Sequence, residues 1–112
     1  MRIVTLVDNY CEQAGLLGEH GLAIYVETAE KKILFDTGAG QALLPNAQRL
    51  GIDLALVDEL VLSHGHHDHT GGLAAFAGIN RRARIRMSPA AFAPKFKGRE
   101  DFIGITSARG LF

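Results

Sequence analysis

Hydrophobic positions along this chain fall into short apolar runs and into segments with helical spacing. The runs are rich in β-branched residues and show little alternation between apolar and polar positions. They predict five strands, over residues 1–7, 21–28, 32–35, 59–62 and 84–87. Only a three-residue turn separates the second strand from the third, so these two strands are expected to form a hairpin.

Helical spacing appears in two segments between the predicted strands. In QALLPNAQRLGI (41–52) apolar residues recur at 43, 44, 47 and 50, and Gly51 is a suitable stop. Pro45 falls in the first turns, where its missing N–H does least damage. A second helix is expected over 71–78 with Thr70 as its cap, and a helical turn is expected over 89–96.

The order of these elements, βββαβαβ, predicts an α/β fold with a mixed sheet, because a hairpin is combined with crossover helices. Strands without clean alternation are typical of sheets that are covered on both faces. The two predicted helices suffice for one face only. We therefore expect something else to cover the second face.

The composition of the chain is that of an ordinary globular domain. With 112 residues, 47% of them hydrophobic and 21% charged, the chain is expected to form one domain over residues 1–112. Twelve basic and twelve acidic residues cancel, which argues against nucleic acid and membrane surfaces as partners. The N-terminal apolar run is too short for a signal peptide, and the expected location is the cytoplasm.

Two further features favour structural interpretations. The basic run over 81–86 has no interleaved aromatic residues, so a solvated strand edge is a better interpretation than a nucleic-acid site. Cys11 is the single cysteine and has Glu12 beside it, without an adjacent basic residue to lower its pKa. An inert thiol is expected there, because free cysteines are usually buried.

The segment SHGHHDHTGG (63–72) holds four of the five histidines of the chain, around one aspartate. On an extended segment His64 and His66 point to the same side and are expected to converge on one point. Asp68 and His69 are expected to face a second point nearby, and His67 is expected to point away. Imidazole and carboxylate donors suit zinc, and they also suit manganese or iron. Two such points about 3.5–4 Å apart would form a two-metal site.

The position of this cluster supports a metal site over a solvated loop that happens to hold histidines. It lies at the carboxyl end of a predicted strand and just before a helix, where α/β sheets place ligands. A tag-like metal binder would be terminal and repetitive, whereas this cluster is internal and contains an aspartate.

Residues 64–69 match the HxHxDH motif, and the chain resembles the metallo-β-lactamase-fold hydrolases. Residues 35–38 resemble the Asp-Thr-Gly segment of that family, and 60–63 and 70–72 resemble the strand and the turn that flank its motif. Residues 19–22 with Asp8 and Asn9 are similar to one subgroup, the dihydropterin ribofuranosyl-aminobenzene phosphate synthase-like proteins.

This resemblance implies an αβ/βα sandwich of which the chain supplies about the first half, and we therefore expect a truncated domain. It implies that His64 and His66 bind one metal and that Asp68 and His69 bind a second, most simply two Zn²⁺, with Mn²⁺ or Fe²⁺ as alternatives. Asp68 would help to activate the attacking water, and Asp36 would support the site from behind. The expected substrate is a small ester, phosphoester or amide.

The family draws a third histidine, a bridging carboxylate and a final histidine from later strands. After His69 this chain has no histidine, and its remaining acids are Glu100 and Asp101. The chain is therefore interpreted as a truncated product, as a partner of a complementing C-terminal half, or as a homodimer that pools its ligands. Whether it is an enzyme stays open. The alternative is a non-catalytic half-domain that binds metal weakly or assembles with a partner chain.

Three residues outside the cluster are also candidates. His20 either reaches the metal site and its substrate or is a surface histidine paired with Glu19. Asn9, with Asp8, either faces the pocket or forms a turn at the end of the first strand. Asp36 is either a ligand or, as we favour, an acceptor that fixes its own loop.

Overall fold

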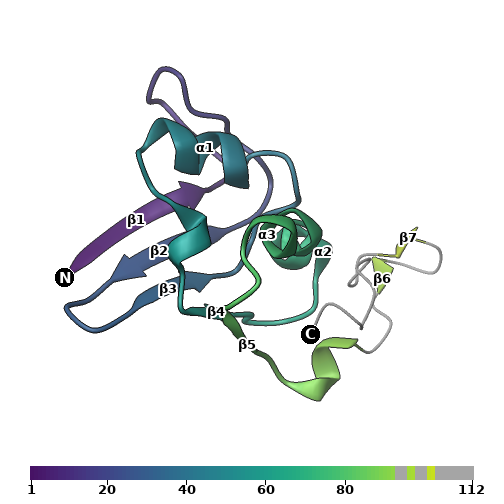
Figure 1. The fold of residues 1–112 in the computed structure, drawn as a ribbon. Coiled ribbons are helices and arrows are strands. Elements are labelled where there is room, and N and C mark those ends of the chain that lie inside the picture. The colour runs from purple at the N-terminus through teal and green to yellow at the C-terminus, as the bar shows by residue number, and fades with distance from the viewer. Residues whose placement is uncertain (93–95, 98–100, 103–112) are drawn as a thin grey trace.

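A five-stranded sheet with helices packed on it forms the body of the computed structural model, which describes residues 1–92, 96–97 and 101–102. The spatial order of the strands equals their order in the chain (Figure 1). All five predicted strands are confirmed, as β1 (Arg2–Val7), β2 (Ala23–Glu27), β3 (Lys32–Phe35), β4 (Glu59–Val61) and β5 (Arg84–Arg86).

The sheet is mixed, as expected for an α/β fold. The pairs β1–β2 and β2–β3 are antiparallel, and β2 and β3 form the predicted hairpin. The pairs β3–β4 and β4–β5 are parallel. Each parallel pair needs a crossover, and the helices lie in these crossovers. As a result, the carboxyl ends of β3 and β4 lie side by side at the same end of the sheet.

The crossovers contain the two helices that the apolar spacing predicted and two shorter helical segments that it did not predict. Helix α1 (Leu43–Arg49) and the 3₁₀ turn η1 (Leu54–Leu56) join β3 to β4. Helices α2 (His67–Thr70) and α3 (Leu73–Ile79) join β4 to β5. A 3₁₀ turn, η2 (Pro89–Phe92), follows β5, and the rest of the predicted 89–96 turn includes residues outside the described part.

Both longer helices pack on the same face of the sheet and form the core there. Leu43 and Ala47 of α1 and Leu73 and Phe76 of α3 are at most 2% exposed. They belong to one cluster with the inward-facing residues of the strands, including Leu34 at 0% exposure. Burying this apolar surface is the main stabilising contribution to the fold.

The second face of the sheet carries the alternate residues of each strand. Because side chains alternate along a strand, the register places two rows on this face: Ile3, Val26, Ile33, Glu59 and Arg84, and then Thr5, Ile24, Phe35, Val61 and Arg86. Ile3 is 62% exposed, whereas the apolar residues of the inner strands on this face are half-buried. This face is less deeply buried than the face that packs against the helices.

Two local expectations are wrong. Thr70 does not cap the second helix, since it ends α2 and its hydroxyl donates to the carbonyl of His66. The residue that precedes α3 is Gly72, without a side-chain cap. The cluster is also not extended throughout, because residues 67–70 form a helical turn.

Strand β5 is an edge of the sheet, and its Arg84 and Arg86 side chains are exposed. Arg86 contacts Glu59 of β4 at 3.2 Å, and Arg82 contacts Asp58 at 2.8 Å. A solvated, charged strand edge is what the sequence predicted for the basic run. Among the described residues, no helix is long and apolar enough to cross a membrane.

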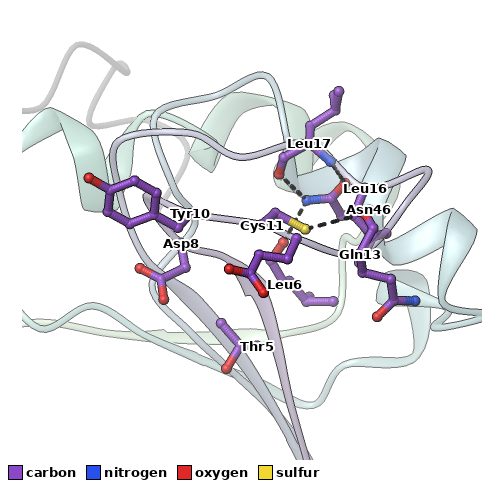
Figure 2. A pocket seen from close by; sticks show the side chains of 10 residues that line it. Thr5, Leu6, Asp8, Tyr10, Cys11, Gln13, Leu16, Leu17 and Asn46 are labelled. Carbon is purple, nitrogen blue, oxygen red and sulfur yellow. Dashed lines mark hydrogen bonds between the residues drawn. The ribbon is translucent and has the colours of Figure 1, made fainter.

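The loop between β1 and β2 is anchored to α1 by one buried amide. Asn46 is 2% exposed, donates to the carbonyls of Leu6 and Leu17 and accepts from the backbone N–H of Leu17. Figure 2 shows the hollow that this loop forms over the end of β1, with Asn46 and Cys11 in its lining. Cys11 is exposed, so the burial expected of it is wrong.

Candidate metal centre

The candidate metal centre forms where β3 and β4 end next to each other. Asp36 directly follows β3, and Ser63 lies two residues after β4. The backbone N–H of Asp36 donates to the carbonyl of Val61 at 2.9 Å, which continues the ladder past the strand ends. The backbone N–H of Ser63 donates to Asp36 Oδ1 at 2.8 Å. These bonds join two loops that lie 27 residues apart in the chain.

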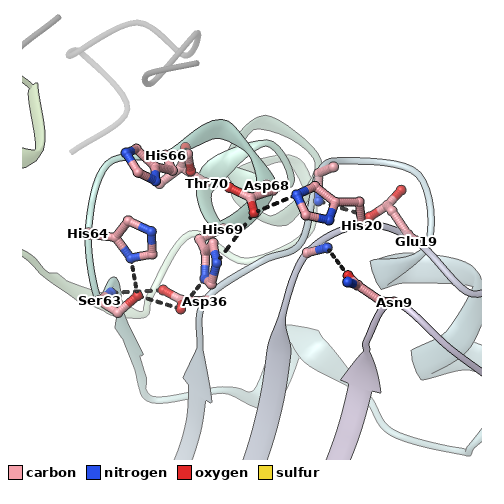
Figure 3. A network of polar contacts seen from close by, with 12 residues as sticks. Asn9, Glu19, His20, Asp36, Ser63, His64, His66, Asp68, His69 and Thr70 are labelled. Carbon is pink, nitrogen blue, oxygen red and sulfur yellow. Dashed lines mark hydrogen bonds and ion pairs between the residues drawn. The ribbon is translucent and has the colours of Figure 1, made fainter. Parts of the chain in front are cut away.

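Three side chains of the histidine cluster converge above this junction. His64, Asp68 and His69 each offer one ligand atom, and the three atoms lie within 4.8 Å of one another. The rings of His64 and His69 have centroids 4.2 Å apart, and His69 Nε2 lies 3.5 Å from Asp68 Oδ2 (Figure 3). All three residues are half-buried, so the group is open to solvent on one side.

Asp36 supports this group from below and determines which ring nitrogens face outward. Its Oδ2 accepts from the Ser63 hydroxyl at 2.6 Å and lies 2.8 Å from His69 Nδ1. A carboxylate only accepts, so His69 Nδ1 carries the hydrogen and its Nε2 keeps a free lone pair. Asp36 itself is 0% exposed, and its carboxylate holds the loop that follows β4 rather than its own loop, for which the sequence favoured it.

The same carboxylate acts on His64 through Ser63. The single hydroxyl hydrogen of Ser63 is used on Asp36, and Ser63 Oγ lies 2.8 Å from His64 Nδ1. Ser63 Oγ therefore accepts from His64 Nδ1, which leaves His64 Nε2 with its lone pair. Both imidazoles thus present Nε2, the nitrogen that binds a metal when Nδ1 is engaged in this way.

The surroundings of His64 also favour its neutral form. Burial lowers the pKa of His64 below its usual value, and the neighbouring rings of His69 and His66 lower it further. Neutral imidazole is the form that binds a metal, because the protonated ring has no free lone pair.

Asp36 has an unusual backbone conformation, with φ of 60°. A non-glycine residue in this left-handed region is uncommon, although Asp tolerates it better than most residues. The conformation turns the chain sharply at the end of β3. It lets the backbone N–H of Asp36 reach Val61 while its carboxylate reaches Ser63 and His69.

Thr37 fixes the helical turn that carries Asp68 and His69. Its backbone N–H donates to the carbonyl of His69 at 2.7 Å, and its hydroxyl donates to the same carbonyl at 2.9 Å. The hydroxyl also accepts from the backbone N–H of Gly72 at 3.0 Å. The packing is close, since a Cβ on Gly72 would lie 2.3 Å from the carbonyl oxygen of Thr37.

The cluster is grouped differently from the two pairs that the sequence predicted. His66 does not join the group of three donors, although its ring lies edge-on to that of His64 with centroids 4.7 Å apart. The backbone of His66 precedes α2, so Asp68 and His69 lie on a helical turn that brings them to His64. His67, which was expected to point away, is also outside the group of three.

The other candidate residues lie on the loop before β2. His20 Nε2 is 3.3 Å from Asp68 Oδ2, so His20 contacts the cluster rather than pairing with Glu19. Asn9 accepts from the backbone N–H of Gly21 at 3.2 Å and holds this loop. Asp8 Oδ1 accepts from the backbone N–H of Asn9, which is the local turn interaction considered for this pair.

Sequence reasoning missed the role of Ser63 and Glu19. Ser63 was noted only as part of the strand before the motif, and its position between Asp36 and His64 depends on the register of β3 and β4. Glu19 accepts from three backbone N–H groups after β3. Glu100 lies outside the described residues, as does the side chain of Asp101.

The donors of this group fit a divalent metal of the zinc class. Two imidazoles and one carboxylate are the donor types of catalytic zinc sites, which combine three protein ligands with one open position. The orienting carboxylate behind the histidines is the outer contact that such ligands usually have. Manganese and iron accept the same donors.

The family sequence model of the metallo-β-lactamase superfamily matches residues 17–106 of the chain. The chain therefore belongs to that superfamily. The mixed sheet and its crossover helices agree with this assignment. The structure of the chain is similar to the crystal structure of a metal-dependent hydrolase of the β-lactamase superfamily, with a TM-score of 0.76. The two sequences are 37% identical over the matched residues. That match covers 92% of this chain and 36% of the hydrolase.

Two further relatives agree with the family. The 7,8-dihydropterin-6-methyl-4-(β-D-ribofuranosyl)-aminobenzene-5′-phosphate synthase of Methanocaldococcus jannaschii is 33% identical over 110 residues, which are 92% of this chain and 37% of the synthase. The metallo-β-lactamase MIM-1 of Novosphingobium pentaromativorans is 25% identical with a TM-score of 0.57, over 78% of this chain and 36% of that one. The chain thus spans about a third of the length of these relatives.

Proposed function

We propose that this chain supplies the first metal-binding segment of a metal-dependent hydrolase, with His64, Asp68 and His69 as ligands. The observation that carries the proposal is the convergence of these three donors within 4.8 Å, with Asp36 holding His69 from behind. The resemblance to a metal-dependent hydrolase supports the reaction class. His66 lies beside the group and is proposed as a further ligand, because its ring is next to that of His64.

When bound, a divalent metal supplies a water of lowered pKa and a Lewis acid for the substrate oxygen. The residues of the chain perform the remaining tasks. Asp36 and Ser63 orient the two imidazoles, and Asp68 is placed beside them to accept a proton from the attacking water. The proposed substrate is a small ester or phosphoester, and related transfer chemistry is included. Zn²⁺ is the proposed metal, in one or two sites.

Metal analysis tests this proposal directly. Purified protein is dialysed against Zn²⁺ and then against metal-free buffer, and the retained metal is measured by plasma mass spectrometry. Retention near one or two equivalents is expected for the wild type and for His67→Ala, whereas Asp68→Ala and His69→Ala lose the metal. Retention in those two variants would overturn the proposed ligand set.

A second candidate function is a metal-binding half that is inactive without a partner chain. The described residues bring together three converging donors, fewer than two complete metal sites need, and this favours the alternative. Hydrolysis of p-nitrophenyl acetate and of bis(p-nitrophenyl) phosphate separates the two candidates. Metal-dependent turnover supports the hydrolase, and metal retention without turnover supports the binding half. Sedimentation in the same samples tests the homodimer.

A further inference from the structure

We propose that His20 is a positioning residue of the metal centre, which holds the Asp68 carboxylate from a loop that Glu19 fixes in place. The proposal rests on the metal centre proposed above. His20 lies on a separate loop, 48 positions before Asp68 in the chain, and is here assigned a task in metal binding.

The contact between His20 and Asp68 is the first observation. His20 Nε2 lies 3.3 Å from Asp68 Oδ2, on the other side of the carboxylate from His69, whose Nε2 is 3.5 Å from the same oxygen (Figure 3). The Asp68 side chain is 17% exposed, whereas that of His20 is 76% exposed. Asp68 thus lies between two imidazoles, of which only His69 belongs to the converging group.

The position of His20 is imposed by its neighbour Glu19. One carboxylate oxygen of Glu19 accepts from the backbone N–H of Ala39 at 2.8 Å. The other accepts from Gln41 at 2.9 Å and from Ala42 at 3.2 Å. Hydrogen bonds to an ionised acceptor are stronger than neutral ones, and three of them leave this segment little freedom. Glu19 therefore ties the loop to the segment that follows β3.

The backbone on the other side of His20 contacts Asp68 directly. Leu22 N–H donates to the carbonyl of Asp68 at 3.3 Å, and Leu22 in turn accepts from Gly38 N–H at 2.9 Å. Gly21 has φ of 150°, and a Cβ there would lie 2.2 Å from the Asp68 carbonyl oxygen. Only glycine allows this approach. The backbone that carries His20 is thus fixed near Asp68 on both sides of this residue.

An exposed imidazole near a carboxylate contributes little to stability as an ion pair. The value of this contact therefore lies in orientation, because the carboxylate is presented to His64 and His69 instead of rotating toward solvent. Groups that orient a metal ligand from behind typically change metal affinity about 10- to 100-fold when they are removed.

Co²⁺ binding, followed by its visible absorption, tests this proposal without relying on turnover. The variants are His20→Ala, which removes the contact, and His20→Gln, whose amide nitrogen replaces Nε2 as a donor. His20→Ala is expected to weaken Co²⁺ binding about 10-fold or more and to change the absorption bands. His20→Gln is expected to restore most of both, and metal-free melting temperatures should agree with that of the wild type.

Glu19→Gln gives an independent arm, with the exposed Glu30→Gln as its matched control. If Glu19 acts through His20, the double variant His20→Ala/Glu19→Gln binds Co²⁺ about as weakly as His20→Ala alone. Additive losses would show that Glu19 does not act through His20.

The outcomes separate the two proposals. If the wild type binds Co²⁺ and His20→Ala binds it equally, His20 has no positioning role, while the metal centre stands. If His20→Gln is as weak as His20→Ala, a hydrogen-bond donor at this position does not position Asp68, and the positioning role is overturned. If the wild type binds no Co²⁺, the metal centre itself is wrong, and this proposal falls with it.

Discussion

Asp36 Oδ2 lies 2.8 Å from His69 Nδ1, although the two residues are 33 positions apart in the chain. The same oxygen accepts from Ser63, whose hydroxyl oxygen contacts His64. One buried carboxylate therefore orients two imidazoles of the candidate metal centre. The position of this carboxylate depends on β3 and β4 being parallel neighbours, because the loops that follow them then leave the sheet at the same end.

Asp36→Asn is expected to weaken Zn²⁺ binding by about 10- to 100-fold. Asparagine keeps the size of the side chain but loses the negative charge and one acceptor, so the hydrogen on His69 Nδ1 is no longer required. Competition with a chromophoric chelator measures the affinity in folded protein. Asp53→Asn is the control, because it makes the same chemical change at a carboxylate that caps η1 and does not contact the candidate ligands. Equal affinities in both variants would show that Asp36 does not orient the ligands.

Gly72→Ala is expected to destabilise the chain by about 1–3 kcal/mol, because the added Cβ would meet the carbonyl oxygen of Thr37 at 2.3 Å. Gly78→Ala in α3 meets nothing within 4 Å and is expected to be neutral or to stabilise by up to about 1 kcal/mol. Urea unfolding followed by circular dichroism compares the two variants. A Gly72→Ala variant as stable as the wild type would contradict the tight packing of the turn between α2 and α3 against Thr37.

Asn46→Ala is expected to cost about 1–3 kcal/mol of stability, since it removes the two hydrogen bonds that Asn46 donates and the one that it accepts. The loop between β1 and β2 should also become more mobile, which limited proteolysis detects as faster cleavage within residues 8–18. Gln48→Ala, an exposed change on the same helix, serves as the control. Unchanged cleavage in Asn46→Ala would show that the loop does not depend on this anchor.

Tyr25 gives the chain a specific loss of stability at high pH. Burial, and next the hydrogen bond donated to Glu27, raise the pKa of Tyr25 to about 12. Above pH 10 an unfolded Tyr25 releases its proton while the folded one keeps it. The unfolded state is then favoured, and stability falls between about pH 10 and 12. The full effect is about 2–3 kcal/mol.

Ultraviolet absorption of tyrosinate in the wild type and in Tyr25→Phe isolates this titration. The difference between the two curves should have its midpoint near pH 12 while the protein stays folded. Urea unfolding of Tyr25→Phe should depend less steeply on pH in the same range. A difference curve centred near pH 10 would contradict the burial of this hydroxyl.

The strands and the longer helices were predictable because each contains a strong local signal. The β-branched apolar run IVTLV is typical of a strand, and the spacing of Leu43, Leu44 and Ala47 is that of a helix with one apolar face. The short helix α2 was not predictable in this way, since HDHT has no apolar periodicity. It forms because residues outside the helix bond to it. The Thr37 hydroxyl donates to the carbonyl of His69, and the Thr70 hydroxyl donates to the carbonyl of His66.

The residues of the candidate site were recognised by type, but not their grouping. Alternation along an extended segment paired His64 with His66, whereas the helical turn at 67–70 brings Asp68 and His69 to His64 instead. The backbone partners of Glu19 and the Asp36 partner of Ser63 lie 20 or more positions away in the chain. Such contacts depend on strand order and register, which no local pattern in the sequence specifies.

The bond from Ser63 to Asp36 spans 27 residues, and the bond from Thr37 to His69 spans 32. In an unfolded chain the donors of residues 64–69 are close in sequence, but the carboxylate that orients both imidazoles reaches them only when these long loops close. We therefore expect the oriented, tight site to form only when β4 lies beside β3. A bound ion would stabilise the folded crossover, and the free energy of unfolding would rise with the concentration of free metal.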